Sequence, residues 1–256
     1  FLRVLQERAF PLDELVLFGS PRSAGNTYTF NGKSLTVKEL KENDDFKGID
    51  IALTSAGGGT SRRFASTITK HGTIMIDNSS AFRMEDDVPL VVPEVNSRDL
   101  HHIPRNIVAN PNCTTIVANV PVWPLHKANP VKRMIVSSYQ AASGAGAKHM
   151  RELVAQMHVI GKEADALLAD PAMAIQALDQ KVINTLRGEA FPTEQFGAPL
   201  AASLIPWIDR PMESGQTREE WKGYAETNKI LGRLSDPIAI DGQCVRIGSM
   251  RCHSQA

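Results

Sequence analysis

Cysteine, aromatic residues and net charge are all scarce in this chain of 256 residues. Only three cysteines are present, at positions 113, 244 and 252, which excludes a disulfide framework and favours a reducing compartment. The 28 basic residues balance the 28 acidic ones, so no charge excess points to nucleic acid or a membrane surface. No apolar run approaches membrane-spanning length. We therefore expect a cytoplasmic protein with no nucleic-acid partner, no membrane partner and no metal.

Neither end of the sequence has the pattern of a natural terminus. The chain starts at Phe1 inside an apolar pattern typical of a helix, and no methionine precedes it. It stops at Ala256, directly after a strand-like run. We expect a fragment of a longer protein that lacks both termini.

The first 112 residues alternate short apolar runs with helix-like or loop segments. The runs cover residues 15–18, 49–54, 73–76, 90–92 and 106–109. Strands that are apolar almost throughout fit a parallel sheet with both faces covered. The pattern predicts a doubly wound α/β domain over residues 1–112.

The rest of the chain does not alternate in this way. A strand-like run at residues 134–139 leads through a Gly-rich turn to a helix with apolar residues spaced three and four apart, from Met150 to Ile160. Another helix is expected after Thr217, because Glu220 completes a capping box. The last segment, residues 238–252, is rich in Val, Ile and Gly. These features predict an α+β domain over residues 113–256.

Two turns follow strands of the first domain, where open parallel sheets bind ligands. The turn GSPRSAGN offers Ser20, Arg22 and Ser23 but no acidic residue, which favours the 2′-phosphate of NADP over the ribose of NAD. A plain polar turn is equally compatible with this segment alone. In the turn TSAGGGTS, glycines precede a helix whose N–H groups can meet an anion. A Gly-x-Gly-x-x-Gly fingerprint is absent.

Cys113 stands between a strand and an apolar helix, in the segment VANPNCTTI. A helix N-terminus stabilises a thiolate, and Asn112 adds an amide donor beside it. A small buried hydrophobic residue is the alternative, since that is the usual role of free cysteine. Pro121 lies within this helix and should kink or shorten it.

A thiolate nucleophile needs a proton carrier, and His253 is the leading candidate among seven histidines. Arg246 and His253 are separated by an odd number of residues, so a regular strand would place them on opposite faces. A bulge at Gly248 would bring them together. Glu219 and Lys222 share a helix face, although an ordinary solvated ion pair is the simpler reading. Surface or packing roles are expected for the histidines at positions 101, 102, 126, 149 and 158, and His71 before Gly72 is expected to be a helix C-cap.

Several long segments together resemble aspartate-β-semialdehyde dehydrogenase. They are DNSSAFRM with VPLVVPEVN, NPNCTTI, SSYQAASGAGAKHMREL, SLIPWID, REEWKGYAETNKIL and CVRIGSMRCHSQA, in the order of the family and over nearly the whole chain. The resemblance implies a Rossmann-type domain followed by a catalytic and dimerisation domain of the glyceraldehyde-3-phosphate-dehydrogenase type. It also implies that an N-terminal Gly-rich turn and a C-terminal helix are missing here.

The resemblance assigns a role to individual residues. It implies Cys113 as nucleophile, His253 as general acid/base and Gln140 as the residue that orients the thioester. Substrate contacts are implied for Arg246 (α-carboxylate), Glu219 (ammonium), for Lys222, Arg83 and Asn112 (phosphate), and for Pro171 on a weaker match. Cofactor contacts are implied for Arg22 and Ser23, and for Ala56, Gly57, Ser143 and Gly144 nearer the nicotinamide. Pro121 has no implied role.

The implied activity is NADP-dependent reductive dephosphorylation of L-aspartyl 4-phosphate to L-aspartate 4-semialdehyde through a cysteine thioester. The pathway implied is the biosynthesis of lysine, methionine and threonine, and the implied assembly is a homodimer or homotetramer. Three alternatives are N-acetyl-γ-glutamyl-phosphate reductase, a non-catalytic NADP-binding domain and a Cys-His hydrolase. The substrate of the first alternative has no free ammonium group for Glu219 to bind. With both termini missing, the fragment itself is expected to be inactive.

Overall fold

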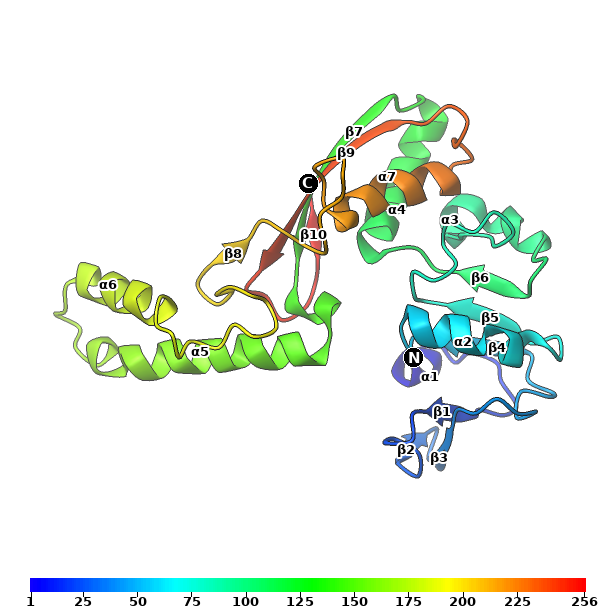
Figure 1. Ribbon diagram of the computed structural model, residues 1–256, viewed down its shortest axis with the longest axis horizontal. Helices are drawn as coiled ribbons and strands as arrows, with labels where there is room; N and C mark the ends of the chain where they lie inside the picture. The colour runs from blue at the N-terminus through cyan, green and yellow to red at the C-terminus, as the bar shows by residue number, and fades with distance from the viewer. The chain divides into compact units, whose positions relative to one another are not determined.

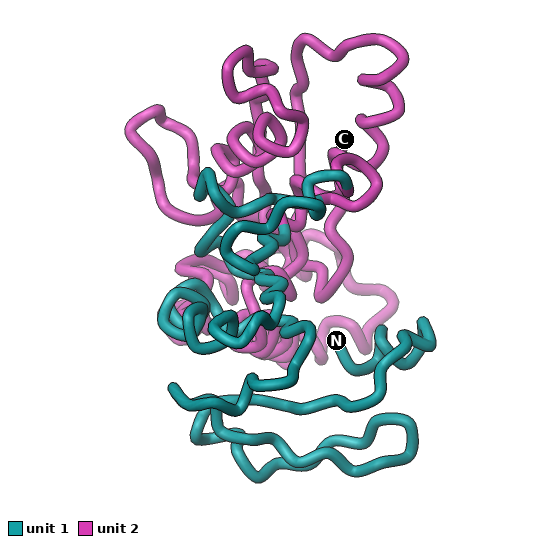
Figure 2. Tube along the Cα trace, turned by 90° about the vertical axis from the view of Figure 1, so that its right-hand side faces the viewer, with its two compact units in different colours: residues 1–91, 98–110 teal, residues 92–97, 111–256 magenta.

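The computed structural model describes residues 1–256, and the chain divides into two compact units (Figure 2). Unit 1 comprises Phe1–Val91 and Arg98–Asn110, and unit 2 comprises Val92–Ser97 and Pro111–Ala256. No helix is both long and apolar enough to cross a membrane.

The centre of unit 1 is a parallel sheet in the order β4-β5-β6 (Figure 1). Its strands are β4 (Ile51–Thr54), β5 (Ile74–Asp77) and β6 (Ile107–Ala109). Helix α2 (Gly58–Thr69) packs against β5 and buries Phe64 and Ile68, while the sheet buries Met75. Residues 90–92 were expected to form a strand, but only an isolated bridge joins Leu90 to Ala109.

Unit 1 also contains a second sheet, in the order β1-β3-β2, which follows the short helix α1 (Leu2–Glu7). Strand β1 (Leu17–Gly19) pairs in parallel with β3 (Lys33–Glu39), and β2 (Thr27–Phe30) forms a hairpin with β3. Asn31 and Gly32 in the turn have φ values of 46° and 77°. An Asn-Gly pair with two positive φ values is the usual signal of a tight hairpin, and the strand analysis missed it.

Unit 2 is organised around a four-stranded sheet in the order β10-β7-β9-β8. Strands β7 (Arg133–Gln140) and β9 (Ala239–Ile247) are parallel neighbours, and β8 (Leu204–Ile205) and β10 (Ser254–Gln255) form the edges. Helix α7 (Arg218–Ile230) packs on β9, and α4 (Cys113–Ala128) packs on α7 (Figure 1). Alternate side chains of β7 and β9 therefore face these helices.

The other helices of unit 2 are α3 (Pro93–Asn96), α5 (Ala147–Leu168) and α6 (Ile175–Leu186). Helices α5 and α6 form an antiparallel hairpin, and Leu153 of α5 joins a small core with Ala142, Leu200 and Ala201. The expected long helix and the capping box of Thr217 with Glu220 are both confirmed. The mixed α/β class is confirmed as well.

One local expectation about unit 2 was wrong and another was wrong in part. Pro121 does not shorten α4, which runs for 16 residues with Pro121 and Pro124 inside it, and a kink at Pro121 stays a prediction. There is also no bulge at Gly248, because β9 ends at Ile247 and the chain turns before β10 begins. Cys252 takes a left-handed φ of 73° in this turn. The turn delivers His253 to the same end of the sheet as Arg246.

Candidate active site

Cys113 is the first residue of α4, and its thiol is exposed. Asn112 is the N-cap, and its side-chain oxygen accepts the Thr114 N–H at 3.0 Å. Such a cap fixes the first turn of a helix. The positive end of the helix macrodipole therefore lies at a solvent-accessible sulfur, which is an arrangement that favours thiolate.

Glu219 of α7 links the residues around this helix start. Its Oε1 accepts hydrogen bonds from Nδ2 of Asn112 at 3.1 Å and from Nε2 of Gln140 at 3.2 Å. Its Oε2 lies 2.9 Å from Nζ of Lys222. Burial alone would raise the pKa of Glu219, but Lys222 and the two amide donors outweigh burial and hold that pKa below its ordinary value. The site therefore contains a buried, ionised carboxylate.

Lys222 is held by two carboxylates, because Asp209 also lies 2.9 Å from its Nζ. Burial by itself would lower the pKa of Lys222, yet Glu219 and Asp209 raise it overall. The simpler reading of Glu219 and Lys222 as a solvated surface pair does not hold, since Glu219 is only 6% exposed.

Arg246 and His253 meet at the backbone of Ala141. Nη1 of Arg246 donates to the Ala141 carbonyl at 2.8 Å, and Nδ1 of His253 accepts the Ala141 N–H at 3.1 Å. A Cβ built on Gly144 would lie 2.8 Å from Nε2 of His253 and 3.3 Å from Nη1 of Arg246. Gly144 therefore lets both side chains pack against the backbone of the turn.

A hydrogen bond and several charges connect the segment that carries His253 with the start of α4. Nε2 of Gln255, two residues after His253, donates to the Thr114 carbonyl at 2.9 Å. The pKa of Arg246 is lowered by burial, while the charges of Glu219 and Cys113 act in the opposite direction. The pKa of His253 is lowered by burial and then by Arg246. Arg246 therefore lies within electrostatic range of Cys113, Glu219 and His253, which places the four side chains in one electrostatic environment.

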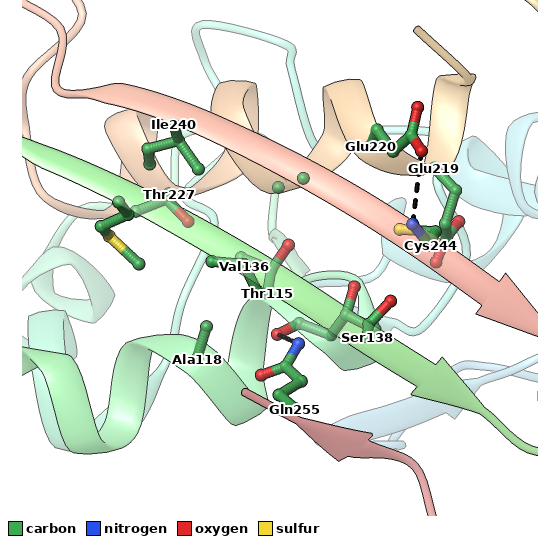
Figure 3. Close-up of a pocket in the computed structure, with 14 residues that line it drawn as sticks. Thr115, Ala118, Val136, Ser138, Glu219, Glu220, Thr227, Ile240, Cys244 and Gln255 are labelled. Atoms are coloured by element: carbon green, nitrogen blue, oxygen red, sulfur yellow. Dashed lines mark hydrogen bonds between the residues drawn. The ribbon is translucent and has the colours of Figure 1, made fainter. Parts of the chain in front are cut away.

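A pocket lies between β7, β9, α4 and α7, directly beside this cluster (Figure 3). Glu219, Ser138, Cys244, Thr115 and Gln255 are among the residues that line it. Oγ1 of Thr115 and Oε1 of Gln255 are buried without a hydrogen-bond partner. Burial raises the pKa of Cys244 to about 11, so this second thiol stays neutral.

Other residues singled out in the sequence lie in unit 1. Arg83 is buried and donates from Nε to the Asn110 carbonyl at 2.9 Å and from Nη2 to the Asn78 carbonyl at 3.1 Å. Ser20, Arg22 and Ser23 form the turn after β1, where the Ser23 N–H and Oγ both donate to the Ser20 carbonyl.

The glycine turn before α2 follows β4. Gly57 is the N-cap of α2 with a φ of 84°, and no side chain caps the helix. A Cβ at Gly57 or Gly59 would meet nothing within 4 Å, so the backbone here is open to a ligand. Ala56 precedes this turn. The donors of both turns fit phosphate oxygens.

Ser143 and Gly144 lie in the short 3-10 helix η2 (Ala142–Ala145), next to His253. Pro171, in contrast, follows α5, whose 22 residues span about 33 Å from the end nearest Gly144. The structure does not bring Pro171 to the cluster within this chain.

Sequence reasoning missed two side chains of the site, Asp209 and Glu226. Asp209 pairs with Lys222, and Oε2 of Glu226 accepts the backbone N–H of Asn112 at 2.6 Å. Glu226 is seven residues after Glu219, a spacing that puts both on one face of a helix. That spacing was the available signal.

Comparisons with known proteins agree with this arrangement. A family model described as semialdehyde dehydrogenase, NAD binding domain, matches residues 1–103. A second, described as semialdehyde dehydrogenase, dimerisation domain, matches residues 122–256. The chain thus contains an NAD(P)-binding domain and a dimerisation domain of this enzyme class.

Individual relatives carry a more specific name. Aspartate-semialdehyde dehydrogenase of Aquifex aeolicus is 43% identical over 258 residues, which cover 100% of this chain and 68% of the relative. The enzyme of the same name from Synechocystis sp. is 42% identical over 255 residues, covering 100% and 67%. The crystal structure of aspartate semialdehyde dehydrogenase II from Vibrio cholerae in complex with ASA has a TM-score of 0.82 at 39% identity, covering 99% and 68%. This chain belongs to the aspartate-semialdehyde dehydrogenase family of oxidoreductases.

Proposed function

We propose that the protein catalyses the NADP-dependent interconversion of L-aspartyl 4-phosphate and L-aspartate 4-semialdehyde, in the biosynthesis of lysine, methionine and threonine. The observation that carries the proposal is the exposed Cys113 thiol at the start of α4, in one electrostatic environment with Glu219, Arg246 and His253. The Vibrio cholerae relative in complex with ASA supports the substrate class.

The charges of the cluster match the charges of this substrate. Arg246 is assigned to the α-carboxylate, because a guanidinium binds a carboxylate through two parallel hydrogen bonds. Glu219 is assigned to the ammonium group, and its ionised, buried carboxylate supports this role. Lys222, Asn112 and Arg83 are assigned to the phosphate. An N-acetylated substrate would bring no ammonium group to Glu219, whose own cationic neighbour is Lys222.

The thiolate of Cys113 attacks the acyl phosphate, a C–S bond forms, and the C–O bond to phosphate breaks. Gln140, held by Glu219 and Ser138, orients the resulting thioester. After reduction of the thioester carbon, the thiohemiacetal releases the aldehyde as its C–S bond breaks, which restores the thiolate. The start of α4 stabilises negative charge throughout.

His253 has one defined proton position in this geometry. Because Nδ1 accepts the Ala141 N–H, a neutral ring carries its proton on Nε2. Burial and Arg246 favour the neutral ring by lowering its pKa. We assign Nε2 as the atom that donates a hydrogen bond to the thiohemiacetal oxygen and takes part in proton exchange there.

The cofactor is proposed to be NADP rather than NAD. When bound, NADPH supplies the hydride. Ser20, Arg22 and Ser23 after β1 are assigned to the 2′-phosphate, because they offer hydroxyl and guanidinium donors and no carboxylate. Ala56 and Gly57 at the start of α2, with Ser143 and Gly144 of unit 2, are assigned to the nicotinamide end.

We assign cofactor binding to residues 1–112, and catalysis and dimerisation to residues 113–256. The outer face of β7 supports the second assignment. Ile135 is 72% exposed and Tyr139 is 41% exposed, on the face away from α4 and α7. This apolar face lies within the matched dimerisation domain and is assigned to a second copy of the chain in a homodimer or homotetramer.

The direct test is reduction of NADP by L-aspartate 4-semialdehyde in the presence of phosphate, measured on the longer protein of which this chain is expected to be a fragment. Turnover is expected to require phosphate and to be faster with NADP than with NAD at equal concentration. Absorbance at the nicotinamide band reports the rate, and N-acetylglutamate 5-semialdehyde serves as the competing substrate. Turnover without phosphate, or preference for the N-acetylated aldehyde, would reject the proposal.

Gly144→Ala tests the packing of the turn against His253 and Arg246. The added methyl group must displace one of these side chains, so kcat/KM is expected to fall by about 10- to 100-fold. Initial rates measure this effect, and circular dichroism checks that the variant is folded. Gly161→Ala in α5, where a Cβ meets nothing within 4 Å, is the matched control and should keep the wild-type rate. Equal rates for both variants would contradict the packing argument.

A further inference from the structure

We propose that Glu226 is a positioning residue for Cys113: its buried carboxylate fixes the backbone before the nucleophile and opposes ionisation of the thiol. The inference rests on the proposed role of Cys113 as nucleophile. Glu226 lies in α7, is 2% exposed, and accepts the Asn112 N–H at 2.6 Å. No direct contact between Glu226 and the substrate is required.

Helix α7 holds Asn112 at two points. Glu219 accepts the side-chain amide of Asn112, and Glu226, two helical turns later, accepts its backbone N–H. The remaining side-chain atom of Asn112, Oδ1, accepts the Thr114 N–H, and its carbonyl accepts the Ile116 N–H at 3.0 Å. Each polar group of Asn112 therefore has a partner within unit 2, which fixes the backbone before Cys113, and one of the two hydrogens on Nδ2 is left for the phosphate.

The packing of α4 on α7 has its own hydrogen bond. Nδ2 of Asn119 donates to Oγ1 of Thr227 at 3.0 Å and to the Thr115 carbonyl at 2.8 Å. The two helices are thus also joined at Asn119, six residues or nearly two turns after the nucleophile, without Glu226. Burying a carboxylate in a protein interior costs free energy. Because Glu226 is buried where it hydrogen-bonds Asn112, the residue before Cys113, we infer that its role concerns the nucleophile.

The negative charge of Glu226 should oppose ionisation of the Cys113 thiol. A carboxylate bonded to the backbone at the start of α4 offsets the positive end of the helix, which otherwise favours thiolate. The other charged or titratable groups on the surrounding elements are Glu219, Glu220, Lys222 and Lys229 of α7, Cys244 and Arg246 of β9, Asp209 and His253. Glu226→Gln keeps a carbonyl acceptor for the Asn112 N–H but removes the charge, so the Cys113 thiol should ionise at lower pH.

The experiment measures the rate of Cys113 alkylation by iodoacetamide as a function of pH, without substrate. A Cys252→Ser background removes the other exposed thiol, and Cys244 is buried with its pKa raised to about 11. The midpoint of alkylation is expected about 0.5–1 pH unit lower in Glu226→Gln, since a nearby charge shifts a thiol pKa. Glu226→Leu, which leaves the buried N–H without an acceptor, should lower kcat about 10- to 100-fold with a smaller change in KM.

Glu152 supplies a matched control. It is also a buried glutamate of unit 2, and its oxygens accept the backbone N–H groups of Gln195 at 2.6 Å and Phe196 at 3.0 Å. Glu152→Gln and Glu152→Leu should change thermal stability without moving the alkylation midpoint or kcat. An unchanged midpoint in Glu226→Gln overturns the proposal, and so does wild-type kcat in a folded Glu226→Leu.

If Glu226→Leu does not fold, the midpoint of Glu226→Gln against Glu152→Gln decides alone. The alkylation assay needs no turnover. An enzyme without semialdehyde dehydrogenase activity would reject the proposed function and still report whether Glu226 controls the thiol.

Discussion

Cys113→Ser is expected to lower kcat by on the order of 10⁴-fold or more. The hydroxyl is smaller and far less acidic than the thiol, so the start of α4 cannot hold it ionised at neutral pH. A serine ester is also a poorer hydride acceptor than a thioester. Phosphate-dependent NADP reduction measures the loss, and a rapid-mixing experiment tests for the burst that acylation of the enzyme produces.

The control for this substitution is Cys252→Ser. Cys252 is also an exposed cysteine of unit 2, in the turn before His253, and no catalytic role is assigned to it. It should keep the wild-type kcat. Substantial turnover by Cys113→Ser, or an equal loss in both variants, would remove Cys113 from the chemistry.

Arg246→Leu is expected to raise the KM for L-aspartate 4-semialdehyde by on the order of 100-fold or more. The change removes the assigned partner of the α-carboxylate and leaves that charge unpaired in a buried site. The kcat should fall less, because Arg246 holds the substrate at a distance from the reacting carbon. Arg251→Leu, an exposed arginine of the same turn, is the matched control and should leave KM unchanged. A wild-type KM in Arg246→Leu would contradict the assignment.

Arg246→Leu should also shift the pH dependence of kcat/KM. Burial and the charge of Arg246 together hold the pKa of His253 below its ordinary value. Without the arginine, burial is opposed by the charge of Glu219, so the pKa of His253 rises and the ring stays protonated to higher pH. The acid limb of the kcat/KM profile should therefore move to higher pH in Arg246→Leu, and should not move in Arg251→Leu.

Residues near one another in the sequence were read well from the sequence alone. The apolar runs indicated β4, β5 and β6, and the Thr217 and Glu220 pair indicated the start of α7. These signals are local, because a cap or a strand depends on residues a few positions apart. The β2–β3 hairpin was missed although its Asn31 and Gly32 turn carries an equally local signal.

Contacts between distant residues could not be read in this way. The turn that brings His253 beside Arg246 depends on a left-handed Cys252 and on the pairing of β10 with β7, neither of which follows from alternation along one strand. Glu226 looked like one more polar residue of a helix until its contact with the Asn112 N–H, 114 positions away, was visible.

The sequence by itself determined the α/β class, the family and the candidate nucleophile at a helix start, because these depend on short patterns and on motifs in a fixed order. Only the tertiary structure decided which groups surround the Cys113 thiol. Charge and hydrogen bonding act over a few ångströms in space regardless of separation along the chain, so the pairing of Glu219 with Asn112, Gln140 and Lys222 exists only once α7 packs against α4 and β9.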